Sequence, residues 1–475
     1  HIHFMGICGT AMASLAGMLK EMGFYVTGSD QNVYPPMSTQ LQEQGIEISE
    51  GYRRENLDPK PDYVVVGNVI SRHFEEAQAL LESQIHYNSL HKALREIDIC
   101  ERNSVVIAGT HGKTTTTAMM SWIAETCGKK PGFLIGGIPL NFPRSFRPPQ
   151  KNNSSQEWFI IEGDEYDTAF FDKVPKFVHY RPKYVILTSI EFDHADIYQD
   201  LNAVLAAFKT LLQLMPEDGI LIYNSDDKNI PQILEYCSWK KIFYGLETGD
   251  YCDIDRANVV GRNQSIVEVQ GERFADVALK LFGPHNTLNA LAAFALSKEL
   301  GWEEHLILQG LASFQGVKRR QEVIGEPHGI VIVEDFAHHP TAVELTVQTM
   351  REKYPQKKLI AVFEPRSATS RRKTFQQDYI KALSGADVVF LPPAFHRDTE
   401  PVEQRFSSEE VISARKAQGV AAESCQSVDE IVQQIKKVAK SGDVILIMSN
   451  GGFGGIYSKL LAELWIEVPL LHFTS

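Results

Sequence analysis

Ser104-Val105-Val106-Ile107-Ala108-Gly109-Thr110-His111-Gly112-Lys113-Thr114-Thr115 joins an apolar run to a Gly-rich turn that carries a lysine. The apolar run predicts a buried strand, and the two glycines predict a tight turn before a helix. Unpaired backbone N–H groups and the positive end of the helix dipole make such a helix start a phosphate site. Lys113 would neutralise the β- and γ-phosphates of ATP, and the Thr114 hydroxyl would ligate Mg²⁺.

The spacing of this turn departs from the general pattern G-x-x-x-x-G-K-T at one position. Ile107 stands where that pattern has its first glycine. An ordinary Gly-rich strand-to-helix turn is therefore the alternative. Gly-Lys-Thr directly after a buried strand favours ATP, with contacts expected from Gly109, Thr110, His111, Gly112, Lys113, Thr114 and Thr115.

Short runs rich in Val and Ile alternate with helical stretches along the chain, which predicts an α/β protein with mostly parallel sheets. We expect three domains: Rossmann-like over residues 1–100, a P-loop ATPase domain over 101–322, and Rossmann-like again over 323–475. A loop rich in Pro, Asn, Ser and Arg is expected at 143–156. Strands are predicted at 2–7, 25–28, 63–66, 104–108, 158–161, 184–187, 219–223, 330–333, 359–363, 387–391 and 444–448.

The composition favours an ordinary globular protein of the cytoplasm. The 475 residues are too many for one hydrophobic core, and the net charge of -13 argues against a nucleic-acid partner. No run approaches the ~20 apolar residues of a membrane span, and no leader is visible, so no membrane partner is expected. The oligomeric state is left open between a monomer and a weak dimer. The six cysteines contain no CxxC pair, which is typical of reduced thiols: Cys8, Cys100, Cys127, Cys237, Cys252 and Cys425.

Two acidic segments follow predicted strands of the central domain: residues 162–167 (Glu-Gly-Asp-Glu-Tyr-Asp) and residues 191–196 (Glu-Phe-Asp-His-Ala-Asp). Acidic runs are usually solvated faces, and a lone histidine is usually structural. Carboxylates at the end of a buried parallel strand instead point to where ligands bind. We therefore expect Glu162 to hold Mg²⁺ and His194 to mark a divalent-metal site, although Mg²⁺ has little preference for imidazole.

Further polar and Gly-rich turns lie at the ends of other predicted strands. Residues 6–13 offer a helix start to a diphosphate, either of a redox cofactor or of a UDP-sugar, and Asp30 lies near the position that reads a ribose hydroxyl. Asn286 and Asn289 fall on one helical face, where they could read adenosine or cap the helix. In the third domain, the turns at 335–340, 364–367 and 449–455 converge on one binding rim, and Arg366 is the candidate to grip a carboxylate there.

These motifs together resemble one family, the Mur ligases, over essentially the whole chain. Gly-Thr-His-Gly-Lys-Thr, Glu-x-Asp-Glu, Glu-Phe-Asp-His, His-Asn-x-x-Asn, Arg-Arg and Asp-x-x-His-His-Pro occur in the family's order. Residues 33–38, 177–180, 364–367 and 449–455 resemble those members that join the salvaged tripeptide L-alanyl-γ-D-glutamyl-meso-diaminopimelate to UDP-N-acetylmuramate. Members that add L-alanine typically have His-Arg near Arg366 and Gly-Ala-Gly-Asp near Gly451, and this chain departs from both patterns.

The resemblance implies roles for individual residues. ATP and Mg²⁺ would be held by Lys113, Thr114, Glu162, His194, Asn286, Asn289, Arg320 and Asp335. The UDP-sugar would contact Gly6, Cys8, Gly9, Thr10, Asp30 and Asn68, and the peptide Arg366, Asn450 and Gly451. His338 is the candidate base for the incoming amine. Some members carry a carbamylated lysine after the metal histidine; Lys209 is the analogue here, and a solvated helix lysine is the favoured alternative.

The implied reaction is amide formation through an acyl phosphate of the muramate carboxylate. Alignment of charged substrates and neutralisation by Lys113, Mg²⁺ and Arg320 would supply most of the catalysis. The nearest rival is the same chemistry with free L-alanine as acceptor. A rival from another class is a non-catalytic, nucleotide-sensing protein, which the retention of Lys113, Glu162 and His194 disfavours. A folate-type ligase or an oxidoreductase would leave one of the two Gly-rich turns unexplained.

Overall fold

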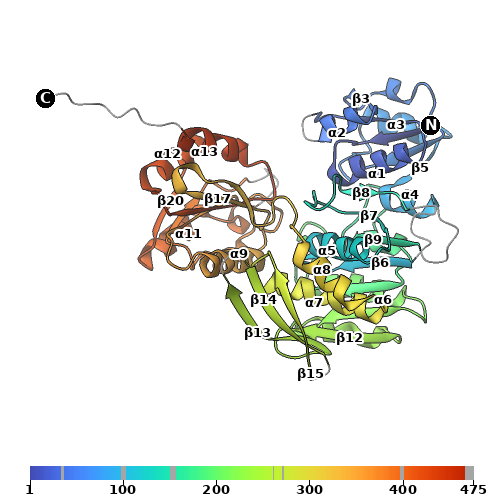
Figure 1. Ribbon diagram of the computed structural model, residues 1–475. Helices are drawn as coiled ribbons and strands as arrows, with labels where there is room; N and C mark the ends of the chain where they lie inside the picture. The colour runs from blue at the N-terminus through green and yellow to red at the C-terminus, as the bar shows by residue number, and fades with distance from the viewer. Residues whose placement is uncertain are drawn as a thin grey trace. The chain divides into compact units, whose positions relative to one another are not determined.

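The computed structural model describes residues 1–33, 37–97, 103–149, 157–259, 262–269, 272–395 and 401–465 (Figure 1). The chain folds into two compact units. The first comprises residues 1–192, 197–280 and 286–317, and the second comprises 193–196, 281–285 and 318–475. Residues 34–36 of the motif at 33–38, Cys100, and residues 150–156 of the predicted loop lie outside the described residues.

The first sheet of the first unit has five parallel strands in the order β3-β2-β1-β4-β5. The order reverses beside β1, and open α/β sheets bind ligands at the C-terminal end of the strands at such a switch point. The strands are β1 (Ile2–Met5), β2 (Val26–Asp30), β3 (Glu47–Glu50), β4 (Tyr63–Val66) and β5 (His86–Ser89). The helices are α1 (Thr10–Glu21), α2 (Met37–Glu43), η1 (Arg54–Leu57), α3 (Glu75–Glu82) and α4 (Leu90–Glu96).

The second sheet of this unit has ten strands in the order β15-β14-β13-β12-β11-β10-β6-β9-β7-β8. Strands from β7 to β13 along this order pair in parallel, whereas β8, β14 and β15 are antiparallel to their neighbours. The strands are β6 (Asn103–Ala108), β7 (Gly132–Leu134), β8 (Phe146–Arg147), β9 (Trp158–Gly163), β10 (Tyr184–Leu187), β11 (Ile220–Asn224), β12 (Lys240–Gly245), β13 (Tyr251–Val259), β14 (Arg262–Val269) and β15 (Glu272–Leu279).

The helices of this second sheet begin where the sequence supplies the right start. Asp200 caps α6 (Leu201–Gln213), because its side chain accepts the Ala203 N–H at 2.9 Å. The left-handed Gly112 precedes α5 (Lys113–Thr126). The remaining elements are η2 (Lys176–His179), η3 (Ile230–Tyr236), α7 (Pro284–Glu299) and α8 (Glu304–Ser313).

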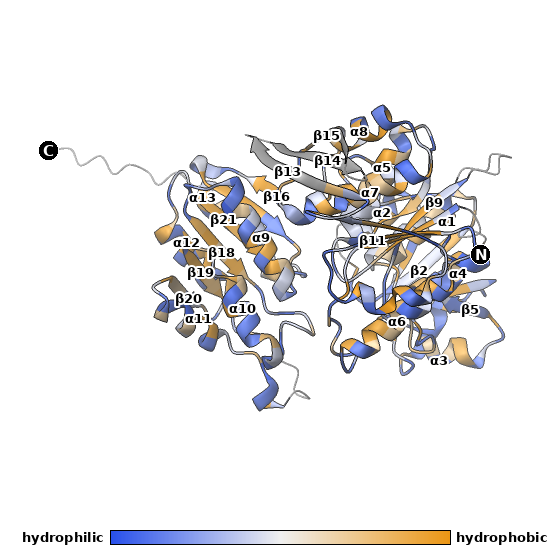
Figure 2. Cartoon of the chain, turned by 90° about the horizontal axis from the view of Figure 1, so that it is seen from below, coloured by the Kyte–Doolittle hydropathy of each residue, from blue (hydrophilic) through white to orange (hydrophobic). Residues whose placement is uncertain are grey.

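The second unit is built on a six-stranded sheet in the order β16-β17-β21-β18-β19-β20, parallel except for β16. Helices α9, α10 and α11 pack on one face and α12 and α13 on the other, over the hydrophobic strands β18, β19 and β21 (Figure 2). Its elements are β16 (Glu322–Gly325), η4 (Pro327–Gly329), β17 (Val331–Asp335), α9 (Pro340–Lys353), β18 (Leu359–Phe363), η5 (Lys373–Phe375), α10 (Gln376–Ala382), β19 (Val388–Leu391), η6 (Val402–Gln404), α11 (Ser408–Ala417), β20 (Ala421–Ser424), α12 (Val428–Val438), β21 (Val444–Met448), η7 (Phe453–Gly455) and α13 (Ile456–Trp465).

The predicted fold class is confirmed: all three sheets are mostly parallel and are interleaved with helices. The predicted exposed loop at 143–156 is wrong at its start. Residues 146–147 form β8, and Phe146 is buried against α1, where a Cβ on Gly17 would lie 2.6 Å from its ring. Besides β8, the strands that were not predicted are β3, β5, β7, β12, β13, β14, β15, β16 and β20. No helix in the described ranges is both long and apolar enough to cross a bilayer.

Candidate active site

The turn between β6 and α5 adopts a backbone conformation that requires glycine at two positions. Gly109 has φ +131° and Gly112 has φ +81°, values that side chains with a Cβ rarely adopt. A Cβ on Gly112 would lie 2.6 Å from Asn289 Oδ1, and one on Gly109 would collide with Thr188 Oγ1. The turn therefore packs directly against α7 on one side and against the segment after β10 on the other.

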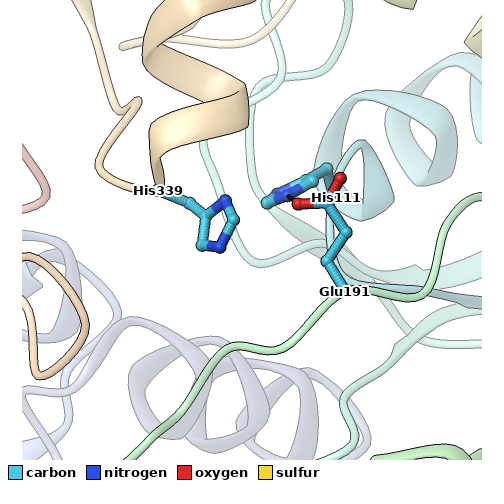
Figure 3. A group of neighbouring side chains, drawn as sticks. All are labelled: His111, Glu191 and His339. Atoms are coloured by element: carbon cyan, nitrogen blue, oxygen red, sulfur yellow. Dashed lines mark hydrogen bonds and ion pairs between the residues drawn. The ribbon is translucent and has the colours of Figure 1, made fainter. Parts of the chain in front are cut away.

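The segment after β10 holds this turn through backbone and side-chain hydrogen bonds. The Thr110 N–H donates to the Ser189 carbonyl at 2.9 Å, and the Glu191 N–H donates to Thr110 Oγ1 at 2.8 Å. The His111 N–H donates to Ser189 Oγ at 3.1 Å. The His111 Nε2 atom also lies 3.2 Å from Glu191 Oε2, the pair of side chains seen in Figure 3. Glu191 therefore fixes two successive residues of the turn.

The ammonium group of Lys113 lies among carboxylates. Its Nζ atom donates to the Gly109 carbonyl at 2.5 Å and lies 3.3 Å from Glu165 Oε2 and 3.7 Å from Asp164 Oδ1. Burial disfavours the charged ammonium, but Glu165 and Asp164 outweigh burial and raise the pKa of Lys113. Lys113 is therefore a cation at any physiological pH, as binding to a triphosphate requires.

Glu162 and Thr114, two of the predicted metal ligands, lie together. The Thr114 hydroxyl donates to Glu162 Oε2 at 2.8 Å, and the Gly136 N–H donates to Glu162 Oε1 at 2.5 Å. Burial is the largest influence on Glu162 and, with Asp164 nearby, raises its pKa against the opposing effects of Lys113 and of the hydrogen bonds from Gly136 and Thr114. Hydroxyl and carboxylate oxygens are ligands that Mg²⁺ accepts together with substrate phosphates. These two residues therefore fit a magnesium ion.

His194, the third predicted ligand, belongs to residues 193–196, which group with the second unit. Its backbone has φ +50°, and its N–H donates to Asp193 Oδ1 at 2.7 Å. Burial opposes the charge on Asp193, but His194, His339 and His338 hold the pKa of that carboxyl below its usual range. The participation of His194 in metal binding stays a prediction.

Asn286 and Asn289 lie inside α7, and neither occupies its N-cap position. Both are buried, and Asn289 Nδ2 donates to Asn286 Oδ1 at 3.4 Å. Asn289 also neighbours Gly112, so Asn286 and Asn289 lie directly beside the turn between β6 and α5. A contact with the adenosine of a bound ATP would require this position. Lys209 lies on α6 with Nζ 3.5 Å from the centre of the Tyr236 ring, the position of an ordinary helix lysine on an aromatic face.

The Gly-rich turn of the first sheet is built on Asp30. Its Oδ2 accepts the Cys8 N–H and its Oδ1 the Asn32 N–H, both at 2.9 Å. Gly6 has φ +84°, and its N–H donates to the Ser29 carbonyl at 2.8 Å. Burial, and then the charge of Asp30, raise the pKa of the Cys8 thiol to about 11. Asp30, predicted to read a ribose hydroxyl, thus holds the turn from beneath.

The rest of this turn faces outward. Gly9 and Thr10 are exposed, and Asn68, directly after β4, is exposed as well. Gly9 occupies the N-cap position of α1, and no side chain caps that helix start. Backbone N–H groups at an uncapped helix start favour an anion. The turn and Asn68 thus lie at the C-terminal ends of β1 and β4, next to the switch point of the sheet.

In the second unit, Asp335 ends β17 and organises the loop after it. The Gln321 N–H donates to Asp335 Oδ2 at 2.9 Å, and the Ala337 N–H donates to Oδ1 at 2.7 Å. Burial is the largest influence on Asp335 and raises its pKa, against the opposing effect of Arg320. The guanidinium carbon of Arg320 lies 4.8 Å from the centre of the Phe336 ring. Asp335 and Arg320, both predicted to contact nucleotide, are therefore neighbours.

His338, the predicted base, follows in the same loop. Its Nδ1 lies 3.0 Å from the Phe336 carbonyl, and a carbonyl only accepts, so Nδ1 carries the proton. The Tyr379 hydroxyl donates to the His338 carbonyl at 2.5 Å. In this tautomer Nε2 is the basic nitrogen, which suits a proton acceptor.

Arg319 joins two loops of the second unit and was not singled out in the sequence. Its Nε lies 2.5 Å from Glu334 Oε1, and its Nη2 donates to the carbonyls of Ser449 at 3.0 Å and Gly451 at 2.6 Å. The adjacent arginines 319 and 320 were the available signal. Arg319 packs on the loops, and Arg320 lies beside Asp335.

The predicted rim residues Arg366, Asn450 and Gly451 lie at the ends of β18 and β21. A Cβ on Gly451 would lie 2.7 Å from Arg366 Nη1, so the absence of a side chain at 451 makes room for the guanidinium. Arg366 is half exposed and lies 3.9 Å from Glu364. The Asn450 side-chain oxygen is buried without a hydrogen-bond partner among the described residues. The structure therefore brings these three residues together.

Comparison with protein families gives three matches that follow one another along the chain. Residues 1–98 match the model described as Mur ligase family, catalytic domain. Residues 107–297 match the Mur ligase middle domain, and residues 319–451 match the Mur ligase, glutamate ligase domain.

Individual relatives cover nearly the whole chain. The UDP-N-acetylmuramate–L-alanyl-γ-D-glutamyl-meso-2,6-diaminoheptandioate ligase of Escherichia coli (strain K12) is 41% identical over 97% of this chain and 97% of its own. The UDP-N-acetylmuramate–L-alanine ligase of Agathobacter rectalis is 32% identical over 98% of each chain. A crystal structure of a murein peptide ligase from Psychrobacter arcticus is 36% identical, with a TM-score of 0.73, and the match covers 98% of this chain and 99% of that one.

Proposed function

The chain belongs to the Mur ligase family, and we propose that it uses ATP to join L-alanyl-γ-D-glutamyl-meso-diaminopimelate to UDP-N-acetylmuramate. This proposal rests on a difference in sequence identity between two kinds of relative. Identity is 41% to a ligase named for that tripeptide and 32% to a ligase named for L-alanine. The Glu364–Ser367 and Ser449–Gly455 segments point the same way. The cellular role is then recycling of cell-wall peptide in the cytoplasm.

We assign ATP to the turn that ends in Lys113. Gly109–Thr115 would surround the phosphates, and Asn286 and Asn289 would contact the adenosine. Arg320 and Asp335 are assigned to the same nucleotide from the second unit. Thr114 and Glu162 would hold Mg²⁺, with His194 as the third candidate ligand. When bound, Mg²⁺ would neutralise charge on the transferred phosphoryl group.

We assign UDP-N-acetylmuramate to the turn of the first sheet. Gly6, Cys8, Gly9 and Thr10 would meet the diphosphate, with Asn68 beside them. The start of α1 supports this assignment, because no side chain caps it and its backbone N–H groups favour an anion. This turn carries no lysine. Asp30 would act indirectly here, because its carboxylate already accepts two backbone N–H groups.

The reaction proceeds in two steps. The lactyl carboxylate attacks the γ-phosphorus of ATP, which gives an acyl phosphate and ADP. The amine of the tripeptide then attacks the acyl carbon, and phosphate leaves as the amide forms. Lys113 and Arg320 would stabilise the transferred charge, and His338 Nε2 would take the amine proton. Arg366, Asn450 and Gly451 are assigned to the peptide.

Measured ADP release tests the choice of acceptor. With UDP-N-acetylmuramate and ATP present, we expect the tripeptide to raise the rate of ADP release at least roughly tenfold more than L-alanine does at equal concentration. Equal or greater stimulation by L-alanine would assign the chain to the alanine-adding reaction. A saturable ATP complex without phosphate release under any acceptor would favour the non-catalytic, nucleotide-sensing alternative. The assay also needs no assumption about oligomeric state, for which we propose a monomer or weak dimer.

A further inference from the structure

Asp164 lies between two ammonium groups. Its Oδ1 is 3.7 Å from Lys113 Nζ, and its Oδ2 is 2.9 Å from Lys176 Nζ. Only Lys113 belongs to the phosphate-type turn. Lys176 comes from η2, more than sixty positions further along the chain, and no motif drew attention to it.

Lys176 is held firmly in this position. Its side chain is 10% exposed, and Nζ lies 3.9 Å from the centre of the Tyr166 ring. Its backbone N–H donates to the Tyr166 carbonyl at 3.2 Å. Residues 164–166 and Lys176 therefore form one packed cluster next to the ATP turn.

The charges in this cluster would change in the proposed ATP complex. In the structure, Lys113 is shared between Asp164 and Glu165. To reach the phosphates, Lys113 must exchange these partners for phosphate oxygens. A buried carboxylate that loses its only cation is strongly disfavoured, whereas one that keeps a second cation is not. The 2.9 Å contact to Lys176 supplies that second cation for Asp164.

We propose that Lys176 is a positioning residue for ATP binding. It stays paired with Asp164 while Lys113 moves to the triphosphate. This inference rests on the proposed function, because it takes Lys113 as the phosphate ligand. It assigns Lys176 no contact with ATP. Removing the Lys176 charge would hold Lys113 more tightly on the carboxylates and would leave Asp164 without an ammonium partner in the ATP complex. Both effects weaken ATP binding.

The test is calorimetric titration of the full-length chain with ATP and magnesium. Lys176→Met should raise the Kd for ATP at least tenfold, a change of roughly 1.4 kcal/mol. Lys176→Arg, which keeps the charge, should stay within about threefold of the wild type. The Kd for UDP-N-acetylmuramate should change far less than the Kd for ATP in both variants. Unchanged ATP affinity in Lys176→Met would overturn the inference.

A second substitution separates this role from a general loss of structure. Asp164→Asn removes the carboxylate that Lys176 is proposed to retain. In that background Lys176→Met should alter the ATP Kd by less than about twofold, and the double variant should bind ATP better than Lys176→Met alone. A tenfold loss in both backgrounds would show that Lys176 acts in another way. If the single variant does not fold, the comparison of Asp164→Asn with the double variant still decides.

The failure of this inference is distinguishable from failure of the proposed function. If wild-type protein gives no saturable ATP complex, or if Lys113→Ala binds ATP as well as the wild type, the proposed function fails. If ATP binding depends on Lys113 but not on Lys176, only the present inference fails.

Discussion

The Gly-rich turn after β6 and the Gly-rich turn after β1 differ in their chemistry. In the turn after β6, Lys113 follows two glycines and lies among Glu165, Asp164 and backbone carbonyls. In the turn after β1, no lysine is present, and the group beneath the backbone is the Asp30 carboxylate, which accepts two N–H groups. Both turns offer a helix start to phosphate, but only one adds a cation and a carboxylate–hydroxyl pair.

This difference matches the work proposed for each turn. A diphosphate that is only held needs donors, and backbone N–H groups at a helix start provide them. A phosphoryl group that is transferred builds up charge, so its site also needs a lysine and a metal. On this proposal the carboxylates around Lys113 belong to the site of phosphoryl transfer, whereas Asp30 supports the backbone of its turn.

Loss of the lysine should have the largest effect. Lys113→Ala should lower the rate of ADP release at least about 10³-fold, because residues 109–115 contain no other lysine or arginine to neutralise the phosphates. The measurement is ADP release with saturating UDP-sugar and tripeptide. The control is the affinity for UDP-N-acetylmuramate, which should stay within about threefold. Near-normal turnover would contradict the role of Lys113.

A methyl group in the two turns should have unequal effects. Gly112→Ala places a Cβ at φ +81°, 2.6 Å from Asn289 Oδ1, and should weaken ATP binding by roughly a hundredfold. Gly9 has φ -65° and an unclashed Cβ position, with its nearest atom at 3.6 Å, so Gly9→Ala should change the KM for UDP-sugar only a few-fold. The measurement is the KM for ATP and the KM for UDP-sugar, each determined for Gly112→Ala and for Gly9→Ala.

Gly128→Ala is the control for backbone strain alone. Gly128 has φ +71° after the end of α5, and nothing lies within 4 Å of an added Cβ. The variant should lose about 1 kcal/mol of stability while the KM for ATP stays near that of the wild type. If Gly112→Ala changes the KM for ATP no more than Gly128→Ala does, collision with Asn289 is not the cause.

Removal of the Asp30 carboxylate should affect only the turn after β1. Asp30→Ala leaves the N–H groups of Cys8 and Asn32 without their acceptor and should raise the KM for UDP-sugar roughly thirtyfold, the size expected for loss of a hydrogen-bond pair to a charged group. The KM for ATP should remain within about twofold. A variant in which both KM values rise together would show that Asp30 supports the whole unit.

The sequence predicted those parallel strands that read as continuous apolar runs, such as Val105, Val106 and Ile107, because they are buried on both faces. It did not predict the parallel strands β3, β5, β7, β12 and β20. It did not predict β14, Arg262–Val269, because apolar and polar residues are mixed in this sequence and no continuous apolar run stands out. It also took β8 for loop, because two residues between prolines and arginines carry too little pattern. Phe146 is buried there by packing on α1, a contact distant in sequence.

The candidate site divides in the same way. Residues within one motif, such as Gly112, Lys113 and Thr114, could be proposed from the sequence because the residues that set the backbone geometry and the chemistry are adjacent in the chain. Lys176 and Arg319 were missed because their partners, Asp164 and Ser449, come from other elements. Asp30 was singled out because it lies near the position that reads a ribose hydroxyl. In the structure its carboxylate instead accepts a backbone N–H of the turn after β1. Side-chain direction of this kind depends on tertiary packing.

The smallest effect is expected at Cys8, and its measurement needs no substrate. Its pKa of about 11, against an ordinary 9.0, means that at pH 8 far less of the thiol is ionised than in a free cysteine. The thiolate that does form is more nucleophilic, so reaction with a disulfide reagent should be roughly tenfold slower than that of free cysteine. Asp30→Asn removes the charge that acts with burial and should speed the reaction a few-fold, as peptide mass mapping of Cys8 can measure. If Cys8 reacts as fast as free cysteine, or if Asp30→Asn leaves its rate unchanged, Asp30 does not lie beneath this turn, and the contrast with the Lys113 turn loses its basis.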